Sequence, residues 1–217
     1  MLLEAALVYA VVLASIKTLY EFRSVTWIGE HLSSLTAAIL LYVPFFLTAR
    51  KHSRISLLGP GGLAHSLRLF AWTSLFIFPP FLLLSHFYQT GIGLHLGLHG
   101  YGWQTLPSAS FLLTQILLIA LPEEYFFRGY LQPVLVRRFS KQLSITHTLS
   151  IPLGVAVTAF FFALAHSVIH LQWWHFAIFF PALVFGWLKE RTGGLVAGIL
   201  FHALSNCVVQ WISTSYR

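Results

Sequence analysis

The sequence predicts an all-α membrane protein with about seven transmembrane helices, and three observations support this prediction. Of the 217 residues, 57% are hydrophobic and 9% are charged, whereas soluble domains carry about 25% charged residues. The acidic residues number six, and all of them are glutamate. The apolar residues form runs close to the ~20 residues that cross a bilayer. These runs cover 2–20, 32–49, 69–88, 109–136, 151–170, 174–189 and 194–213.

The runs take up most of the chain, so we expect a single integral membrane domain over residues 1–217. The first run starts without a basic segment before it, which predicts an uncleaved helix rather than a signal peptide. We expect residues 1–108 to contribute three spans and an outer loop. Residues 109–213 contain the other four runs and the polar residues that suggest chemistry, so we expect them to form the catalytic core.

Lysine and arginine are concentrated in the connectors at 50–68, 137–150 and 189–193, and are absent from 89–108 and 170–173. Because cytoplasmic loops are enriched in these residues, we expect the N-terminus inside and the C-terminus outside. We expect a multi-pass protein of the cytoplasmic membrane of a prokaryote. Topology and anionic lipid explain the basic loops, so we expect no nucleic-acid partner. The glycine-rich segment 89–108 is expected to be an interfacial loop, with a lid as the alternative.

The fourth run contains two adjacent glutamates and an arginine, in LPEEYFFRGYLQP. Ionisable residues inside a membrane are costly and are functional candidates by default. At about 100° per residue, Glu124 and Arg128 lie about 40° apart on a helix, whereas Glu123 and Arg128 lie about 140° apart. Arg128 should therefore pair with Glu124. Glu123 is left without a local partner, and we expect desolvation to raise its pKa toward neutrality, as a general base requires.

Two later runs contain further polar residues. His166 lies near the end of the fifth run, in FFALAHSVIH, with Phe162 one turn before it. A neutral imidazole near Glu123 would share the activation of a water molecule. In GILFHALSNCVV, His202 and Asn206 are four residues apart and share a helix face. An imidazole and a carboxamide aimed at one point are suitable donors to an oxyanion, although interhelical hydrogen bonds alone would also explain such residues.

Together the three segments resemble the CPBP family of intramembrane glutamic proteases. EEYFFR at 123–128 fits the EExxxR motif of that family, FALAH at 162–166 fits FxxxH, and HALSN at 202–206 fits HxxxN. The family includes CAAX prenyl endopeptidases, relatives that process bacteriocins or confer self-immunity (Abi-like), and relatives paired with C-terminal sorting signals. The motif order, their spacing and their positions within apolar runs all agree, over roughly residues 109–210.

The resemblance implies an endopeptidase that cleaves a membrane-anchored or lipidated protein near its C-terminus, without a cofactor or a metal. Glu123 would be the general base, and His166 would help it to polarise the attacking water. His202 and Asn206 would hold the tetrahedral oxyanion. The residues implied to brace the site are Glu124, Arg128 and Phe162. Cys207 points away from Asn206 and is expected to pack in the core; as the single cysteine, it excludes an internal disulfide.

A metal enzyme is one alternative, because Glu123, His166 and His202 together offer donor types that bind zinc. The chain lacks the HExxH spacing, and the one-turn pairs His166–His170 and His95–His99 are expected to be interfacial or hydrogen-bonded.

Two further alternatives belong to other functional classes. A proton-coupled transporter or channel would use intramembrane glutamate and histidine as a relay. A non-catalytic immunity or membrane-binding protein would keep the fold and occupy a partner in the membrane.

Overall fold

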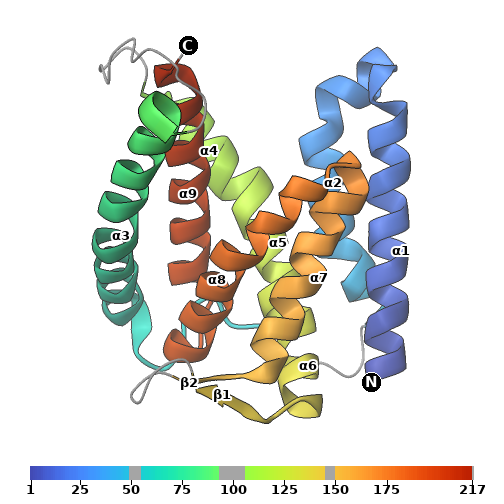
Figure 1. Cartoon of the computed structure of the whole chain (residues 1–217). Coiled ribbons are helices and arrows are strands. Elements are labelled where there is room, and N and C mark those ends of the chain that lie inside the picture. The colour runs from blue at the N-terminus through green and yellow to red at the C-terminus, as the bar shows by residue number, and fades with distance from the viewer. Residues whose placement is uncertain (49–54, 93–105, 145–149, 217) are drawn as a thin grey trace.

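The computed structural model describes residues 1–48, 55–92, 106–144 and 150–216, which form a bundle of helices (Figure 1). The all-α membrane fold is therefore confirmed. The single helices are α1 (Leu2–Glu21), α2 (Thr26–Thr48), α3 (Gly62–Phe87), α7 (Leu153–His170), α8 (Phe179–Thr192) and α9 (Val196–Ser215). Short segments η1 (Phe22–Ser24), η2 (Tyr88–Ile92) and η6 (Trp173–Ile178) follow α1, α3 and α7.

The fourth long helix, here called the fourth span, is built of five consecutive segments. They are α4 (Ala109–Thr114), η4 (Gln115–Ala120), α5 (Leu121–Glu124), η5 (Tyr125–Leu131) and α6 (Gln132–Arg138). The segments η4 and η5 are π-helical. Each contains the residue four positions before a proline, Leu118 before Pro122 and Gly129 before Pro133. A proline ring clashes with that carbonyl and supplies no N–H to it, and a wider turn relieves the clash.

Six helices of the described residues are long and apolar enough to cross a membrane, where the sequence predicts about seven. The span expected at 174–189 is the one that differs. There the chain forms the 3₁₀ turn η6 and then α8, which has 14 residues. At ~1.5 Å per residue such a helix is about 21 Å long, shorter than the ~30 Å hydrocarbon core. Figure 1 shows α8 running obliquely between α7 and α9, and it packs against both.

The connector after the fourth span forms a short hairpin. Strand β1 (Gln142–Ser144) pairs antiparallel with β2 (Ser150–Pro152), with Leu143 opposite Ile151. Helix α7 therefore begins at Leu153, slightly later than the predicted span. Gly154 allows α7 to approach α6 closely, because a Cβ at this position would lie 2.4 Å from the Val136 backbone.

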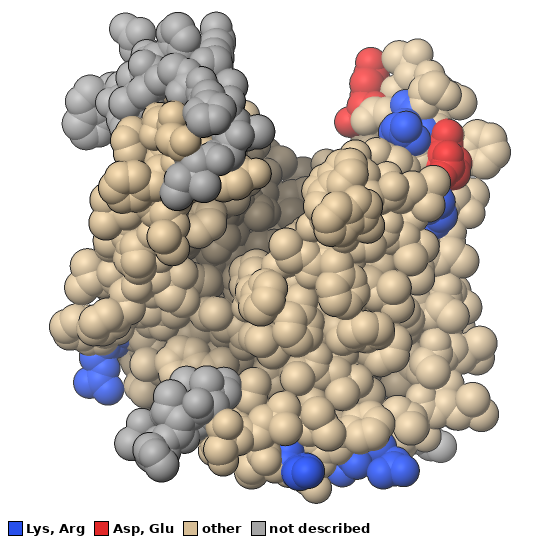
Figure 2. Space-filling view, viewed as in Figure 1, with Lys and Arg blue, Asp and Glu red and all other residues tan. Residues whose placement is uncertain are grey.

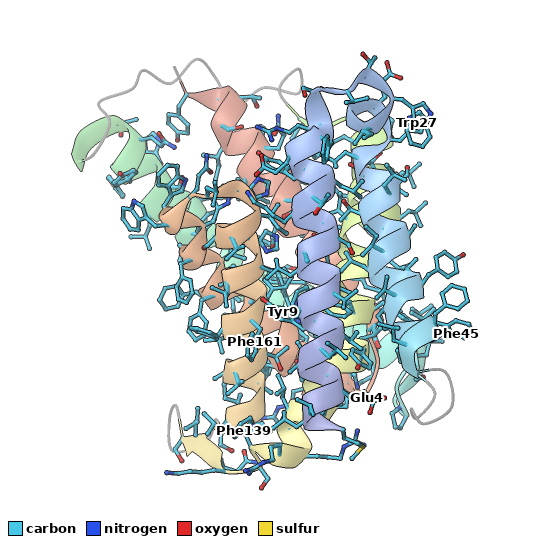
Figure 3. The ribbon with its side chains drawn as sticks, turned by 90° about the vertical axis from the view of Figure 1, so that its right-hand side faces the viewer. Glu4, Tyr9, Trp27, Phe45, Phe139 and Phe161 are labelled. Atoms are coloured by element: carbon cyan, nitrogen blue, oxygen red, sulfur yellow. The ribbon has the colours of Figure 1, made fainter. Side chains whose placement is uncertain are left out.

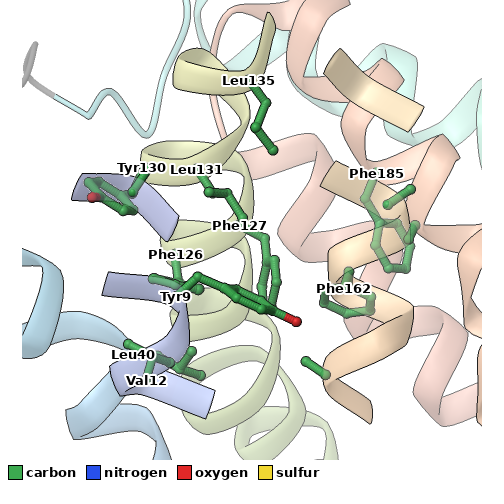
Figure 4. Close-up of a cluster of buried hydrophobic side chains, with 14 of the residues drawn as sticks. Tyr9, Val12, Leu40, Phe126, Phe127, Tyr130, Leu131, Leu135, Phe162 and Phe185 are labelled. Carbon is green, nitrogen blue, oxygen red and sulfur yellow. The ribbon is translucent and has the colours of Figure 1, made fainter. Parts of the chain in front are cut away.

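The main hydrophobic core lies where the N-terminal helices meet the fourth span (Figure 4). Tyr9 of α1 packs edge-on against Phe127 of the fourth span and Phe161 of α7, and its hydroxyl donates a hydrogen bond to the Phe161 carbonyl at 2.8 Å. Phe127 in turn packs edge-on against Phe162 of α7. These contacts hold the middle of the fourth span, which carries Glu123 and Glu124, between α1 and α7.

The outer surface of the bundle is apolar, as contact with lipid requires. Trp27 and Phe45 of α2 are exposed and point away from the bundle (Figure 3). Large exposed apolar patches on a protein mark a contact with a partner or a membrane, and the length of the six helices identifies the membrane here.

Basic side chains gather at the end of the bundle where α6 and α8 end (Figure 2). They include Arg137 and Arg138 in the last turn of α6 and Lys189 and Arg191 in the last turn of α8. At the opposite end the cations lie beside acids, and Lys17 forms an ion pair with Glu21 at 2.5 Å. The distribution of charge along the bundle is therefore asymmetric.

Some sequence predictions concern residues outside the described ranges. They include the cations Arg50, Lys51 and Arg54, the pair His95–His99, and the loop or lid over most of 89–108.

Candidate active site

The predicted pair of Glu124 and Arg128 forms inside the bundle. Nη1 of Arg128 lies 3.1 Å from Oε1 of Glu124, and the two side chains are 0% and 1% exposed. Nη2 of Arg128 donates to the Ala182 carbonyl of α8 at 3.0 Å, and the guanidinium lies over the rings of Phe162 and Phe185. A buried charge is tolerated only when it is paired, so this pair ties the fourth span to α7 and α8.

Glu123 points toward two histidines from other helices, as predicted. Its Oε2 lies 3.9 Å from Nε2 of His166 on α7 and 3.7 Å from Nε2 of His202 on α9. This oxygen is buried and has no hydrogen-bond partner within the described part of the chain. Buried polar atoms are usually satisfied. A carboxylate oxygen directed at two imidazoles over these distances suits a water molecule between the three groups.

The hydrogen bond made by Nδ1 of each histidine determines which ring nitrogen carries the proton and which has the lone pair. Nδ1 of His166 lies 2.9 Å from the Phe162 carbonyl, and a carbonyl oxygen can only accept, so Nδ1 carries the proton. Nδ1 of His202 lies 3.0 Å from Oε1 of Glu124. As a carboxylate paired with Arg128, Glu124 likewise accepts the hydrogen bond. In the neutral form of each ring, Nε2 therefore offers a lone pair toward Glu123.

Aromatic rings hold the histidines in place. Phe162 contacts the rings of His166, at 4.6 Å between centroids, and His202, at 5.9 Å. Phe185 of α8 stacks on His202 with a centroid distance of 4.6 Å and an interplanar angle of 14°. Phe162 thus contacts both histidines and the Arg128 guanidinium. Phe185 lies in the same packing layer, and the sequence patterns did not single it out.

Asn206 also faces the fourth span, but its partner is a residue that the sequence reasoning missed. Its Nδ2 donates to Oε1 of Gln115 at 2.7 Å. Within the described residues, the side-chain hydrogen bond of Asn206 thus goes to Gln115 rather than to Glu123. The signal for Gln115 in the sequence is a polar residue inside an apolar run, because polar side chains in membrane helices commonly form hydrogen bonds between helices. It also opens the π-helical segment η4.

A glycine lets the last helix approach the glutamates. A Cβ at Gly198 of α9 would lie 3.2 Å from Oε2 of Glu124. Gly198 is one turn before His202, so the missing side chain leaves room for the Glu124 carboxylate against α9. Cys207 is a free, buried thiol on the same helix.

In the possible zinc site, Oε2 of Glu123 lies 3.9 Å from Nε2 of His166 and 3.7 Å from Nε2 of His202. Among the residues described by the structure, no group of three or more histidine, cysteine or acidic side chains is placed to hold a metal ion. Nδ1 of His202 is already hydrogen-bonded to Glu124, so Nε2 is the nitrogen of this ring that faces Glu123.

The second half of the chain matches a known protein family. The family described as type II CAAX prenyl endopeptidase, Rce1-like, matches residues 103–208. The match covers 106 of the 217 residues, and this segment contains the three motifs. The family predicted from the three motifs is thereby confirmed, and with it the class of membrane protease. No curated protein and no solved structure matches the chain.

The Rce1-like segment, residues 103–208, contains Glu123 and the two histidines that face it, His166 and His202. It also contains the hydrogen-bonded pair of Gln115 and Asn206. Helices α1 and α2 lie outside the matched segment but pack against it, α1 against α7 and α2 against the fourth span. The Rce1-like core is thus closed on one side by helices that the family match does not cover.

Proposed function

We propose that this Rce1-like protein is a glutamic-type intramembrane endopeptidase. It would hydrolyse a peptide bond near the C-terminus of a membrane-anchored or lipidated protein. The observation that carries the proposal is the approach of Glu123 Oε2 to Nε2 of both His166 and His202, at 3.9 and 3.7 Å. A general base needs a proton-accepting atom within hydrogen-bond reach of its water, and this arrangement provides one.

In the first step, water held by Glu123 attacks the carbonyl carbon of the scissile bond. Glu123 takes one proton from the water, and Nε2 of His166 accepts the other hydrogen bond, since its lone pair is free while Nδ1 donates to the Phe162 carbonyl. A C–O bond forms and the carbonyl oxygen becomes an oxyanion. The C–N bond then breaks, and the proton held by Glu123 passes to the leaving amine. The products are a carboxylic acid and an amine, and Glu123 is ionised again. The proton of the acid then passes to the amine to give a carboxylate and an ammonium group, so atoms and charge balance.

The oxyanion would be held by His202 and Asn206. Because Nδ1 of His202 already donates to Glu124, Nε2 can donate to the oxyanion only when both ring nitrogens carry a proton. The Asn206 amide has two N–H groups, and one of them is used by Gln115. The second N–H is the donor that we assign to the oxyanion. Glu124, Arg128 and Phe162 would keep these donors in position.

The charge distribution supports an orientation for the protein. The basic ends of α6 and α8 would face the cytoplasm under the positive-inside rule. The N-terminus would then be inside and the C-terminus outside, in the cytoplasmic membrane of a prokaryote.

The proposal is tested by Glu123→Gln, which keeps the shape of the side chain and deletes the base. The probe is an internally quenched peptide with an S-farnesylcysteine followed by three residues, incubated with protein purified in detergent. Loss of a general base lowers turnover by about 10²–10⁴-fold. We expect a loss of this size for Glu123→Gln and none for Glu30→Gln, a matched change of an exposed glutamate.

Equal turnover by the wild-type protein and purified Glu123→Gln would refute this mechanism. Absence of cleavage by the wild-type protein would refute the proposed substrate class. Mass spectrometry of protein C-termini, from cells with and without the chain, would then search for other substrates.

Exhaustive chelation distinguishes the metal alternative. We expect wild-type turnover to survive chelation, with no zinc in the purified protein by elemental analysis. Loss of activity on chelation and its recovery on addition of zinc would instead assign Glu123 and the histidines to a metal centre.

A further inference from the structure

A cavity of about 210 Å³ lies beside Glu123, between the fourth span, α7 and the first two helices. Glu123 and His166 form part of its wall. The facing wall includes Val12 and Ile16 of α1 and Thr36 of α2. The candidate active site is therefore continuous with a cavity that residues 103–208 do not enclose alone.

The size and the lining of the cavity restrict what it can hold. Apolar side chains make up most of the lining, and the hydroxyl of Tyr9, which also borders the cavity, is bonded to the Phe161 carbonyl. Apolar cavities of about 150 Å³ accept a benzene-sized group, whereas pockets for drug-sized ligands begin near 300 Å³. A volume of about 210 Å³ therefore suits one large apolar side chain and is small for a long lipid chain.

We propose that this cavity binds the apolar side chain of the substrate residue on the carboxyl side of the scissile bond, and that α1 and α2 select that residue. The inference rests on the proposed function, because the scissile carbonyl must lie about 3 Å from the water held by Glu123. Successive Cα atoms are 3.8 Å apart. A residue that adjoins the bond is thus within reach of a cavity whose wall contains Glu123.

Selection by α1 and α2 follows from which helices build each wall. The catalytic wall comes from the fourth span and α7, inside the Rce1-like segment. The facing wall comes from helices outside that segment, and α2 packs along the fourth span through η4, α5 and η5. Changes in α2 can therefore alter the cavity without altering the side chains that surround the water.

Thr36 is the position that tests the inference most directly. It lines the cavity, is half-buried, and belongs to none of the groups assigned to the chemistry. Thr36→Phe would fill part of the cavity, and Thr36→Ala would enlarge it slightly. Ser34 lies two residues away on α2 and is exposed, so Ser34→Phe adds the same bulk outside the cavity and is the matched control.

The probe is a set of quenched S-farnesylcysteine peptides in which the residue after the cysteine is Ala, Val, Leu or Phe. The readout is the ratio of kcat/KM for the Phe peptide to that for the Ala peptide. A side chain that no longer fits an apolar pocket typically changes such a ratio by about 10–200-fold. We expect Thr36→Phe to lower the ratio at least about tenfold, Thr36→Ala to hold or raise it, and Ser34→Phe to leave it unchanged.

The outcomes separate this inference from the proposed function. If the wild-type protein cleaves the peptides and Thr36→Phe keeps the wild-type ratio, the cavity assignment is overturned and the endopeptidase function stands. If the wild-type protein cleaves none of the peptides, both fall. Should Thr36→Phe fail to fold in detergent, by gel filtration and thermal unfolding, the Thr36→Ala ratio decides: a fall of that ratio below the wild-type value contradicts the assignment.

Discussion

His202 donates a hydrogen bond from Nδ1 to Oε1 of Glu124 at 3.0 Å, while its Nε2 lies 3.7 Å from Oε2 of Glu123. One imidazole from α9 thus contacts both adjacent glutamates of the fourth span. Glu124, which also pairs with Arg128, is part of the support for His202 as well as a partner for the arginine. The proposed base, Glu123, and the proposed brace, Glu124, are therefore linked through His202.

Arg128→Ala should lower both folded yield and activity. Removing one partner of a buried ion pair costs about 3–5 kcal/mol, because Glu124 would keep its charge in a buried place. The double variant Glu124→Gln/Arg128→Met removes both charges, so it should recover most of the thermal stability but not the activity. Thermal unfolding in detergent and peptide turnover measure the two effects. A fully stable Arg128→Ala protein with a purely chemical defect would move Arg128 from brace to catalyst.

The two histidines should differ in what their loss does to stability. His166 is 24% exposed and its described hydrogen bond is local, to the Phe162 carbonyl. We expect His166→Ala to lower turnover about 10²-fold with little change in unfolding. His202 is buried and bonded to Glu124, so His202→Ala should lower turnover and also cost about 1–3 kcal/mol of stability. Equal stability losses for both variants would contradict this difference.

Gln115 should act as a positioning residue for Asn206. Gln115→Leu removes the acceptor for Asn206 Nδ2. The loss of one hydrogen bond of about 0.5–1.5 kcal/mol predicts a fall in kcat of up to about tenfold, with KM little changed. Gln115→Glu keeps an acceptor and should retain most of kcat, whereas Gln210→Leu, an exposed glutamine on α9, is the control. A fall in KM alone or no rescue by glutamate would contradict the assignment.

The proposed orientation predicts which surface residues a membrane-impermeant reagent reaches. Ser24 is the last residue of η1 and Ser140 lies two residues after α6, and both are exposed. The end of α1 that leads into η1 and the end of α6 lie at opposite ends of the bundle (Figure 1). In a Cys207→Ala background, Ser24→Cys should be labelled by an impermeant maleimide on intact spheroplasts. Ser140→Cys, beside the basic end of α6, should be labelled only after permeabilisation. The reverse pattern would invert the topology.

Several properties of this protein follow from the sequence because their causes are local. The apolar runs predict membrane helices, since the cost of exposing charge in lipid acts on each segment separately. The pairing of Glu124 with Arg128 follows from the one-turn spacing within a single helix. The pair forms although Arg128 lies in the π-helical segment η5, so the local widening of the helix does not separate the two side chains.

The tertiary structure decided the features that depend on how different helices pack against one another. Motif spacing does not reveal that Gln115 binds Asn206, that Phe185 stacks on His202, or that α1 and α2 close the cavity beside Glu123. Periodicity shows which face of a helix is polar, but not which partner packs against it. The length of α8 also depends on packing. The composition of residues 174–189 resembles that of a membrane span, but the structure forms a helix of 14 residues that packs between α7 and α9. The sequence by itself thus determined the membrane class, the family motifs and the local ion pair, and packing across helices decided the geometry around Glu123.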